Sequence, residues 1–192
     1  MQRAMCVMFA ALAAAAAAAA RAEPVTYKLD PTHTWTTWEV RHFGTSTYRG
    51  RFDRKEGTVT VDRAARTGRV QLTIDLTSVD TGVGLLDHKL QEPDFFDAGQ
   101  FPTATFVGEE FRFDGDSVSE VRGQLTMKGV THAVTLKATG FNCYQNPLLR
   151  REVCGGDFSA TLNRADWGVS YGGPFPVGND VKLSVEVEAI RE

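Results

Sequence analysis

The segment 84–102, GLLDHKLQEPDFFDAGQFP, gathers acidic and basic side chains around a single histidine. Carboxylates close to an imidazole can move protons in general acid–base catalysis or bind a metal ion. The same residue types also suit a solvated helix face followed by a turn that an aspartate stabilises. The charged side chains of this segment are Asp87, His88, Lys89, Glu92, Asp94 and Asp97.

The spacing of these residues disfavours a catalytic or metal-binding site. Asp87 and His88 are adjacent, so on a helix their side chains point about 100° apart and do not form an orienting pair. The sequence also contains no G-x-S-x-G motif, no H-E-x-x-H motif and no cysteine in a catalytic context. We therefore predict no catalytic residue, no metal ligand and no enzymatic activity, and we assign Asp94 to a turn.

The other histidines are scattered along the chain. His33 precedes the first long strand, where a turn histidine is expected, and His132 lies at a hairpin start and is expected to be exposed. His42 alternates with Trp38 and Val40, which places it on the apolar face of its strand. There it is either a hydrogen-bonded core residue or the group that orients a ligand head in an apolar pocket.

Large aromatic side chains accumulate in segment 84–102 and on the expected strand faces, and small residues alternate with them. This mixture fits a fully packed core and equally fits an apolar cavity, so the sequence leaves both open. The aromatic residues are Trp38, Phe43, Phe95, Phe96, Phe101, Phe106, Phe158 and Trp167, and the small ones are Ala104, Gly123, Ala138 and Ala160.

The chain after residue 22 shows the two-residue periodicity of β-strands almost throughout. Apolar and polar residues alternate over 69–77 and 181–189, and six shorter runs show a weaker form of this pattern. Eight regularly spaced strands with turn residues between them predict an all-β fold, an eight-stranded antiparallel barrel. Leu85, Leu86 and Leu90 have helical spacing, which predicts a short helix that ends before Pro93 and connects the third strand to the fourth.

The first 22 residues have the layout of a secretory signal peptide. An alanine-rich apolar run follows Arg3 and ends at Ala20-Arg21-Ala22, a small-x-small cleavage site. We expect cleavage near Ala22, a periplasmic or secreted protein, and a single domain over 23–192. No later segment is apolar enough to span a membrane, so we do not expect an integral membrane protein.

Export implies an oxidising compartment for the cysteines. Cys6 leaves with the signal peptide, and the remaining pair, Cys143 and Cys154, is expected to form a disulfide. The net charge of −3 gives no electrostatic footprint for nucleic acid. A small basic patch is read as a solvated strand face, and it consists of Arg49, Arg51 and Arg54.

Five segments, taken in order, resemble the YceI-like family, which is named for polyisoprenoid binding. The resemblance covers essentially the whole chain after the signal peptide. Each segment alone is a weak match, and the five together are specific. They are YKLDPTHTWTTWEVRHFG (27–44), TGVGLLDHKLQEPDFFDAGQFPTATF (81–106), GQLTMKGVTHAVTL (123–136), LNRADWGVSYG (162–172) and VGNDVKLSVEVEA (177–189).

The resemblance implies a lipocalin-like barrel with a long apolar pocket in a periplasmic or secreted protein that is not an enzyme. Its ligands would be polyisoprenoids, isoprenoid quinones or similar long-chain amphiphiles, held for transport or storage without a further cofactor. Carried over position by position, the ligand-binding residues would be Trp38, Val40, His42, Phe43, Leu85, Leu90, Phe95, Phe96, Phe101, Phe106 and Trp167.

One position departs from the family pattern. Many relatives read D-x-H-L before D-F-F-D, and here Lys89 occupies the histidine position while His88 lies one place earlier. The role of that histidine therefore does not pass to His88, and Lys89 is a candidate donor to a polar headgroup. Two alternatives stay open: a lipid-modifying isomerase or hydrolase that uses Asp87, His88 and Lys89, and a filled barrel that acts as an interaction or stress-response module. The oligomeric state is also open, with a homodimer among the options.

Overall fold

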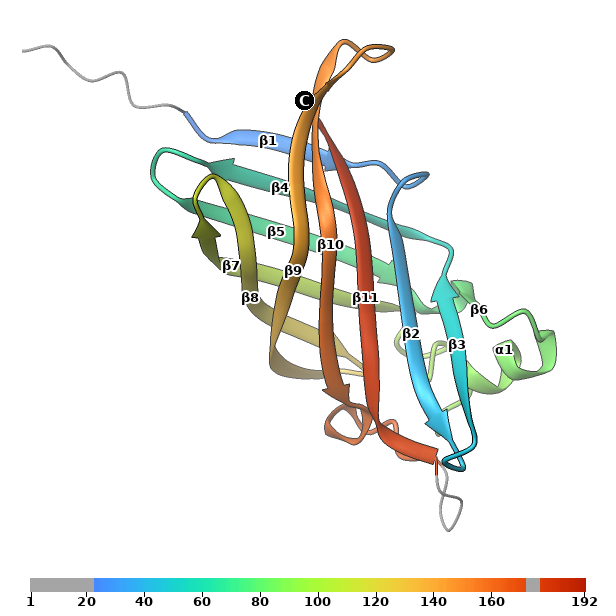
Figure 1. The fold of residues 1–192 in the computed structure, drawn as a ribbon. Helices are drawn as coiled ribbons and strands as arrows, with labels where there is room; N and C mark the ends of the chain where they lie inside the picture. Colours follow the sequence, from blue (N-terminus) through green and yellow to red (C-terminus); the bar gives the residue numbers. More distant parts are fainter. Residues whose placement is uncertain (1–22, 172–176) are drawn as a thin grey trace, which may run out of the picture.

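The computed structural model describes residues 23–171 and 177–192, so the expected signal peptide lies outside the described residues. Eleven strands form one antiparallel sheet that curls into a barrel (Figure 1). The strands are β1 Val25–Leu29, β2 Trp35–His42, β3 Ser46–Phe52, β4 Lys55–Asp62, β5 Thr67–Asp75, β6 Val79–Asp80, β7 Thr103–Asp114, β8 Ser117–Met127, β9 Val130–Asn146, β10 Arg151–Asn163 and β11 Val177–Arg191. The helices are η1 Leu76–Ser78, α1 Gly84–Leu90 and η2 Arg164–Trp167.

The barrel closes through the long strand β11, which has different neighbours at its two ends. Its last residues pair with β1, where Arg191 lies opposite Tyr27, and its first part pairs with β2, where Leu183 lies opposite Trp38. The closed ring runs β1–β4–β5–β7–β8–β9–β10–β11, and β2, β3 and β6 extend the sheet beside it. The predicted eight-stranded antiparallel barrel is therefore confirmed.

Seven of the eight segments predicted to be strands form the closed ring, and one does not. The run that became β2 belongs to the extension, and β1, a strand of five residues, completes the ring. Strands β3 and β6 were also not anticipated. Strand β3 is largely exposed and carries Gly50 where Trp38 packs across it, so its inner face has no continuous apolar pattern.

Helix α1 connects the β5–β6 region to β7, as the spacing of its leucines predicts. It ends at Leu90, and the chain then folds back tightly: the Phe96 amide donates to Leu90 O at 3.0 Å and the Asp97 amide to Glu92 O at 2.9 Å. Asp97 adopts a left-handed backbone conformation in this turn, with φ at 50°. None of the helices described is long and apolar enough to cross a membrane.

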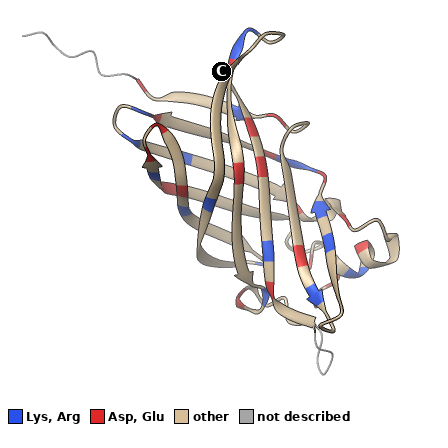
Figure 2. Ribbon diagram, in the orientation of Figure 1, with Lys and Arg blue, Asp and Glu red and all other residues tan. Residues whose placement is uncertain are grey.

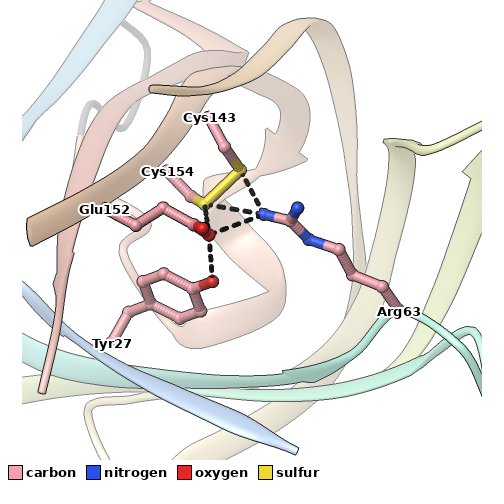
Figure 3. Close-up of a disulfide and its surroundings, with 5 residues drawn as sticks. All are labelled: Tyr27, Arg63, Cys143, Glu152 and Cys154. Atoms are coloured by element: carbon pink, nitrogen blue, oxygen red, sulfur yellow. Dashed lines mark hydrogen bonds and ion pairs between the residues drawn. A yellow bond between two sulfur atoms is a disulfide. The ribbon is translucent and has the colours of Figure 1, made fainter. Parts of the chain in front are cut away.

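The predicted disulfide between Cys143 and Cys154 is confirmed, and it joins directly opposed residues of β9 and β10 (Figure 3). The Arg63 guanidinium reaches the two sulfur atoms from β4–β5, with its Nη2 atom 2.6 Å from Cys143 Sγ and 3.0 Å from Cys154 Sγ. The same nitrogen donates to Glu152 at 2.9 Å, and the Tyr27 hydroxyl donates to Glu152 at 2.5 Å. Burial, and then this hydrogen bond, raise the pKa of the Tyr27 hydroxyl.

The basic patch on β3 and the β3–β4 turn is a solvated strand face, as predicted. Figure 2 shows blue segments along β3 and a red segment on the neighbouring β2. The ion pairs span 2.7–3.0 Å, and they are Arg49–Glu39, Arg51–Asp53, Arg51–Asp80 and Arg54–Asp75. Exposed pairs of this kind contribute roughly 0–1 kcal/mol each, so the patch needs no functional explanation.

Candidate functional site

Two apolar cavities lie inside the barrel. The larger one, the large chamber, has a volume of about 280 Å³, and the smaller one, the small chamber, about 90 Å³. The same strands line both: β5 contributes Ile74 to the large chamber and Leu72 to the small one, and β7 contributes Ala104 and Phe106 respectively. Because residues two apart on a strand share a face, the chambers follow each other along one lumen.

The open lumen decides between the two readings of the aromatic residues. A chamber of about 280 Å³ is far larger than the packing voids of an ordinary core. Its volume lies just below the range typical of small-molecule pockets, roughly 300–1,000 Å³. Six of the eight aromatic side chains therefore line the two chambers rather than fill one another's space, and they are Trp38, Phe95, Phe96, Phe106, Phe158 and Trp167.

Seven of the residues carried over from the family line the large chamber. They come from β2, from α1 with the turn that follows it, and from η2, so three regions far apart in sequence meet around one space. These residues are Trp38, Val40, His42, Leu90, Phe95, Phe96 and Trp167.

The structure places the other four elsewhere. Phe106 lines the small chamber, and Phe101 packs against Gly129 in the β8–β9 turn. Phe43 is 45% exposed in the β2–β3 turn, where its φ of 53° turns the chain. Leu85 is 85% exposed, which corrects its assignment to the inner helix face. Five positions on an α-helix correspond to about 140° of rotation, so Leu85 faces away from Leu90, whereas Leu86 shares its side and lines the chamber.

Several lining residues were not among those assigned to ligand binding from the sequence. For most of them the signal was present, because the two-residue alternation places Val181 and Leu183 on the apolar face of β11. No local pattern identifies Tyr48, which reaches the chamber from β3, or Tyr171, which reaches it from the segment after η2. The chamber residues missed include Thr36, Tyr48, Ile74, Leu86, Ala104, Leu125, Leu162, Arg164, Tyr171, Val181 and Leu183.

Arg164 places a positive charge on the wall of the large chamber. Its guanidinium donates to four backbone carbonyls, those of Val169 and Tyr171 at 2.8 Å, Gly178 at 3.0 Å and Val177 at 3.3 Å. Among the described residues no carboxylate pairs with it. Burial lowers the pKa of Arg164 from its usual range. An anionic or strongly polar ligand head would therefore be attracted to this part of the wall.

Two further polar atoms on the chamber wall lack hydrogen-bond partners among the described residues. These atoms are Thr36 Oγ1 and Trp38 Nε1, on neighbouring inward positions of β2. An unpaired buried polar atom costs about 1–3 kcal/mol, so a local rearrangement that gives either atom a ligand oxygen would recover part of that cost.

The charged side chains of segment 84–102 stabilise the crossover between β5 and β7. The Asp87 carboxylate accepts hydrogen bonds from the Thr81 amide at 2.8 Å and the Thr81 hydroxyl at 2.6 Å. Lys89 lines the large chamber, but it pairs with Glu92 at 2.5 Å and Asp94 at 2.9 Å. These hydrogen bonds raise the pKa of Lys89, so it stays charged.

The remaining histidines take different positions. His88 is exposed and forms no ion pair within the part of the chain that the structure describes. His33 is in a turn, 2.8 Å from Asp30, as expected. His42 lies on the chamber wall and stacks on Tyr48, with ring centroids 4.3 Å apart. No histidine is therefore paired with a carboxylate at the chamber.

The barrel wall opens between β9 and β10 next to the large chamber. The two strands pair from Arg151 opposite Asn146 down to Ser159 opposite Lys137, and beyond that pair they diverge. A groove of about 700 Å³ fills the divergence, and Leu162 and Trp167 line both this groove and the large chamber. Trp167 is 2% exposed and donates from Nε1 to Leu125 O at 3.1 Å, so its indole closes the wall at this point.

A closed antiparallel barrel around an apolar lumen, with one helical crossover, is the architecture of lipocalin-like proteins. Within that class the chain belongs to the YceI-like family, whose domain model matches residues 27–189. A UPF0312 protein of Pseudomonas paraeruginosa is 35% identical over 185 residues, which cover 95% of each chain.

Solved structures share the fold. The crystal structure of Burkholderia cenocepacia BcnA superposes with a TM-score of 0.69 at 25% identity and covers 84% of this chain and 99% of that one. A polyisoprenoid binding domain from Saccharophagus degradans, implicated in plant cell wall breakdown, superposes with a TM-score of 0.62 at 16% identity. That match covers 88% of this chain and 99% of the other, and it shows a common barrel.

Proposed function

We propose that this protein binds one polyisoprenoid, isoprenoid quinone or similar long-chain amphiphile inside its barrel. The observation that carries the proposal is the large chamber, an apolar space of about 280 Å³ that continues toward the small chamber along the same strand faces. A hydrocarbon chain in this lumen loses its contact with water at a gain of about 25 cal/mol per Å², before the costs of binding. The polyisoprenoid-binding relative in the same fold supports this class of ligand.

The polar groups of the large chamber suggest how the ligand is oriented. Arg164 supplies a positive charge, and Thr36 and Trp38 supply hydrogen-bonding atoms, all on a wall that is otherwise mostly apolar. A phosphate, carboxylate or quinone oxygen at the end of the chain would lie near these groups. No catalytic step and no further cofactor form part of this proposal.

We further propose that the protein works after export, as a carrier or store of its lipid in the periplasm or outside the cell. The signal-like residues 1–22 support export, and so does the disulfide between Cys143 and Cys154, because disulfides persist in oxidising compartments. A barrel that encloses the chain shields an insoluble molecule from water between membranes.

Titration of the lipid-free protein with a polyprenyl alcohol is expected to change tryptophan fluorescence and to saturate at one ligand per protein molecule. Trp38 and Trp167 line the large chamber, so a ligand that enters it alters the surroundings of two of the three tryptophans. The corresponding alcohol with a single isoprene unit is the control, and it should bind far more weakly because it buries less apolar surface. Equal responses to the two alcohols, or no saturation, would refute the proposed ligand class.

A further inference from the structure

The hairpin between β9 and β10 extends beyond the end of the barrel and ends in two exposed leucines (Figure 1). We call residues 147–150, with Arg151 after them, the hairpin tip. Leu148 is 90% exposed and Leu149 is 47% exposed. Single exposed leucines are common on protein surfaces, but two adjacent ones at the far end of a projection form an apolar point that water solvates poorly.

The geometry of the turn does not require these leucines. The Asn146 side chain accepts the amides of Leu148 and Leu149, each at 3.0 Å, and the Arg150 amide donates to Asn146 O at 2.8 Å. The turn is therefore held by Asn146 and the backbone, and polar residues at 148 and 149 would satisfy it equally well. The leucine side chains contribute to a surface rather than to the fold.

The base of the hairpin is held together covalently. The disulfide joins Cys143 to Cys154 below the tip, and Arg63 contacts the two sulfur atoms from a neighbouring loop (Figure 3). A cross-linked two-stranded arm loses less conformational freedom on binding than a flexible loop does. The tip is thus presented in a fixed position at the end of the barrel.

Positive charge directly follows the leucines. Arg150 and Arg151 are both exposed, and neither side chain forms an ion pair with any residue in the described ranges 23–171 and 177–192. Figure 2 shows their blue segment near the tip. Apolar side chains next to free cations match a bilayer with anionic headgroups, which offers hydrocarbon beneath a layer of negative charge.

We propose that the hairpin tip docks the protein on an anionic membrane. Leu148 and Leu149 insert among the acyl chains, while Arg150 and Arg151 bind the phosphates of the lipid headgroups. This inference goes beyond the proposed function, because docking on a bilayer does not depend on whether the barrel holds a lipid.

A second exposed apolar surface provides a matched control. Leu85 on α1 is 85% exposed beside Val83, at 55%, and α1 lies well away from the hairpin tip (Figure 1). The charged residues nearest to it in sequence are Asp87 and Lys89, and Lys89 is already paired with Glu92 and Asp94. The α1 surface therefore has exposed apolar residues without free cations.

The test is co-sedimentation of the purified exported protein with vesicles of phosphatidylglycerol and phosphatidylcholine in equal parts. We expect binding that weakens with salt, because screening shortens the reach of the arginine charges. The double substitution L148S/L149S should weaken binding by more than about tenfold. Neutralising Arg150 and Arg151 as R150Q/R151Q should weaken it about fivefold per arginine, whereas L85S should leave it unchanged.

The outcomes separate docking from ligand binding. L148S/L149S should retain the wild-type polyprenyl titration and the wild-type thermal transition, which shows that the barrel is intact. No binding to anionic vesicles, equal binding to vesicles of phosphatidylcholine alone, or loss of binding in L85S but not in L148S/L149S would each overturn the docking proposal. None of these results would affect the proposal for the barrel interior.

Discussion

Replacing Ala104 by phenylalanine is expected to abolish ligand binding while leaving the barrel folded. Ala104 is 3% exposed and lines the large chamber from β7, so the added ring extends into the space of about 280 Å³. The polyprenyl titration should show at least a tenfold loss of affinity, because the ring displaces part of the chain from its apolar contacts. The apo protein should melt at an unchanged or higher temperature, since filling an empty cavity commonly stabilises a protein.

The control for this variant is the neighbouring position. Thr105 follows Ala104 on β7 and points to the opposite face of the sheet, so T105F adds the same ring outside the lumen. T105F should bind ligand like the wild type. If A104F binds normally, or if T105F loses binding to the same extent, the ligand does not occupy the large chamber.

Removing the disulfide is expected to have the largest effect on stability. The double variant C143A/C154A should lower the free energy of unfolding by about 3 kcal/mol, because the unfolded chain regains the entropy of a loop that spans eleven residues of sequence. For a protein of this size the melting temperature should fall by about 10 °C. Differential scanning calorimetry of the two proteins measures both quantities.

A reductant provides the internal control. It should lower the melting temperature of the wild type toward that of C143A/C154A and leave the double variant unchanged. A reductant-insensitive wild type, or a double variant that melts with the wild type, would show that the bond does not stabilise the protein. Ligand binding should persist in C143A/C154A below its melting temperature, because neither cysteine lines the large chamber.

The architecture was largely predictable from strand periodicity, and the exceptions have tertiary causes. Alternation in segments such as 181–189 requires one wet and one dry face, and the barrel supplies them. Strand β3 gives no such signal because Gly50 leaves its inner face empty for the Trp38 indole, which arrives from the neighbouring strand. The divergence of β9 and β10 also has no local signal, since each strand keeps its pattern to the end and only their pairing stops.

The residues that line the large chamber were predictable on the strands, where alternation determines which side chains face inward, and less so in the crossover. Trp38, Val40 and His42 follow β2 into the lumen, as alternation requires. Helix α1 has only seven residues, so adjacent leucines leave its phase ambiguous, and Leu86 rather than Leu85 faces inward. Phe43 shows a different limit, because it directly follows the inward-facing His42 and lies exposed in the turn after β2, so the family position did not carry over to the lumen.

The charged residues show why residue type alone misleads. Asp87 and Lys89 suggest chemistry in sequence, yet hydrogen bonds to Thr81 and ion pairs to Glu92 and Asp94 use them in the crossover. Arg164, which no local motif distinguishes, carries its charge on the chamber wall because the backbone of two other segments folds around it. A charge matters for binding when its partners leave it unneutralised, and only the folded chain shows which charges these are.

The most direct test of the central claim is mass spectrometry of the lipid that copurifies with the protein under native conditions. We expect the wild type to carry a single molecule with an isoprenoid or similar long hydrocarbon chain, and A104F prepared in parallel to carry none. Protein that contains no such molecule, and that takes up none after lipid is removed and supplied again, would contradict the proposal that this barrel binds lipid.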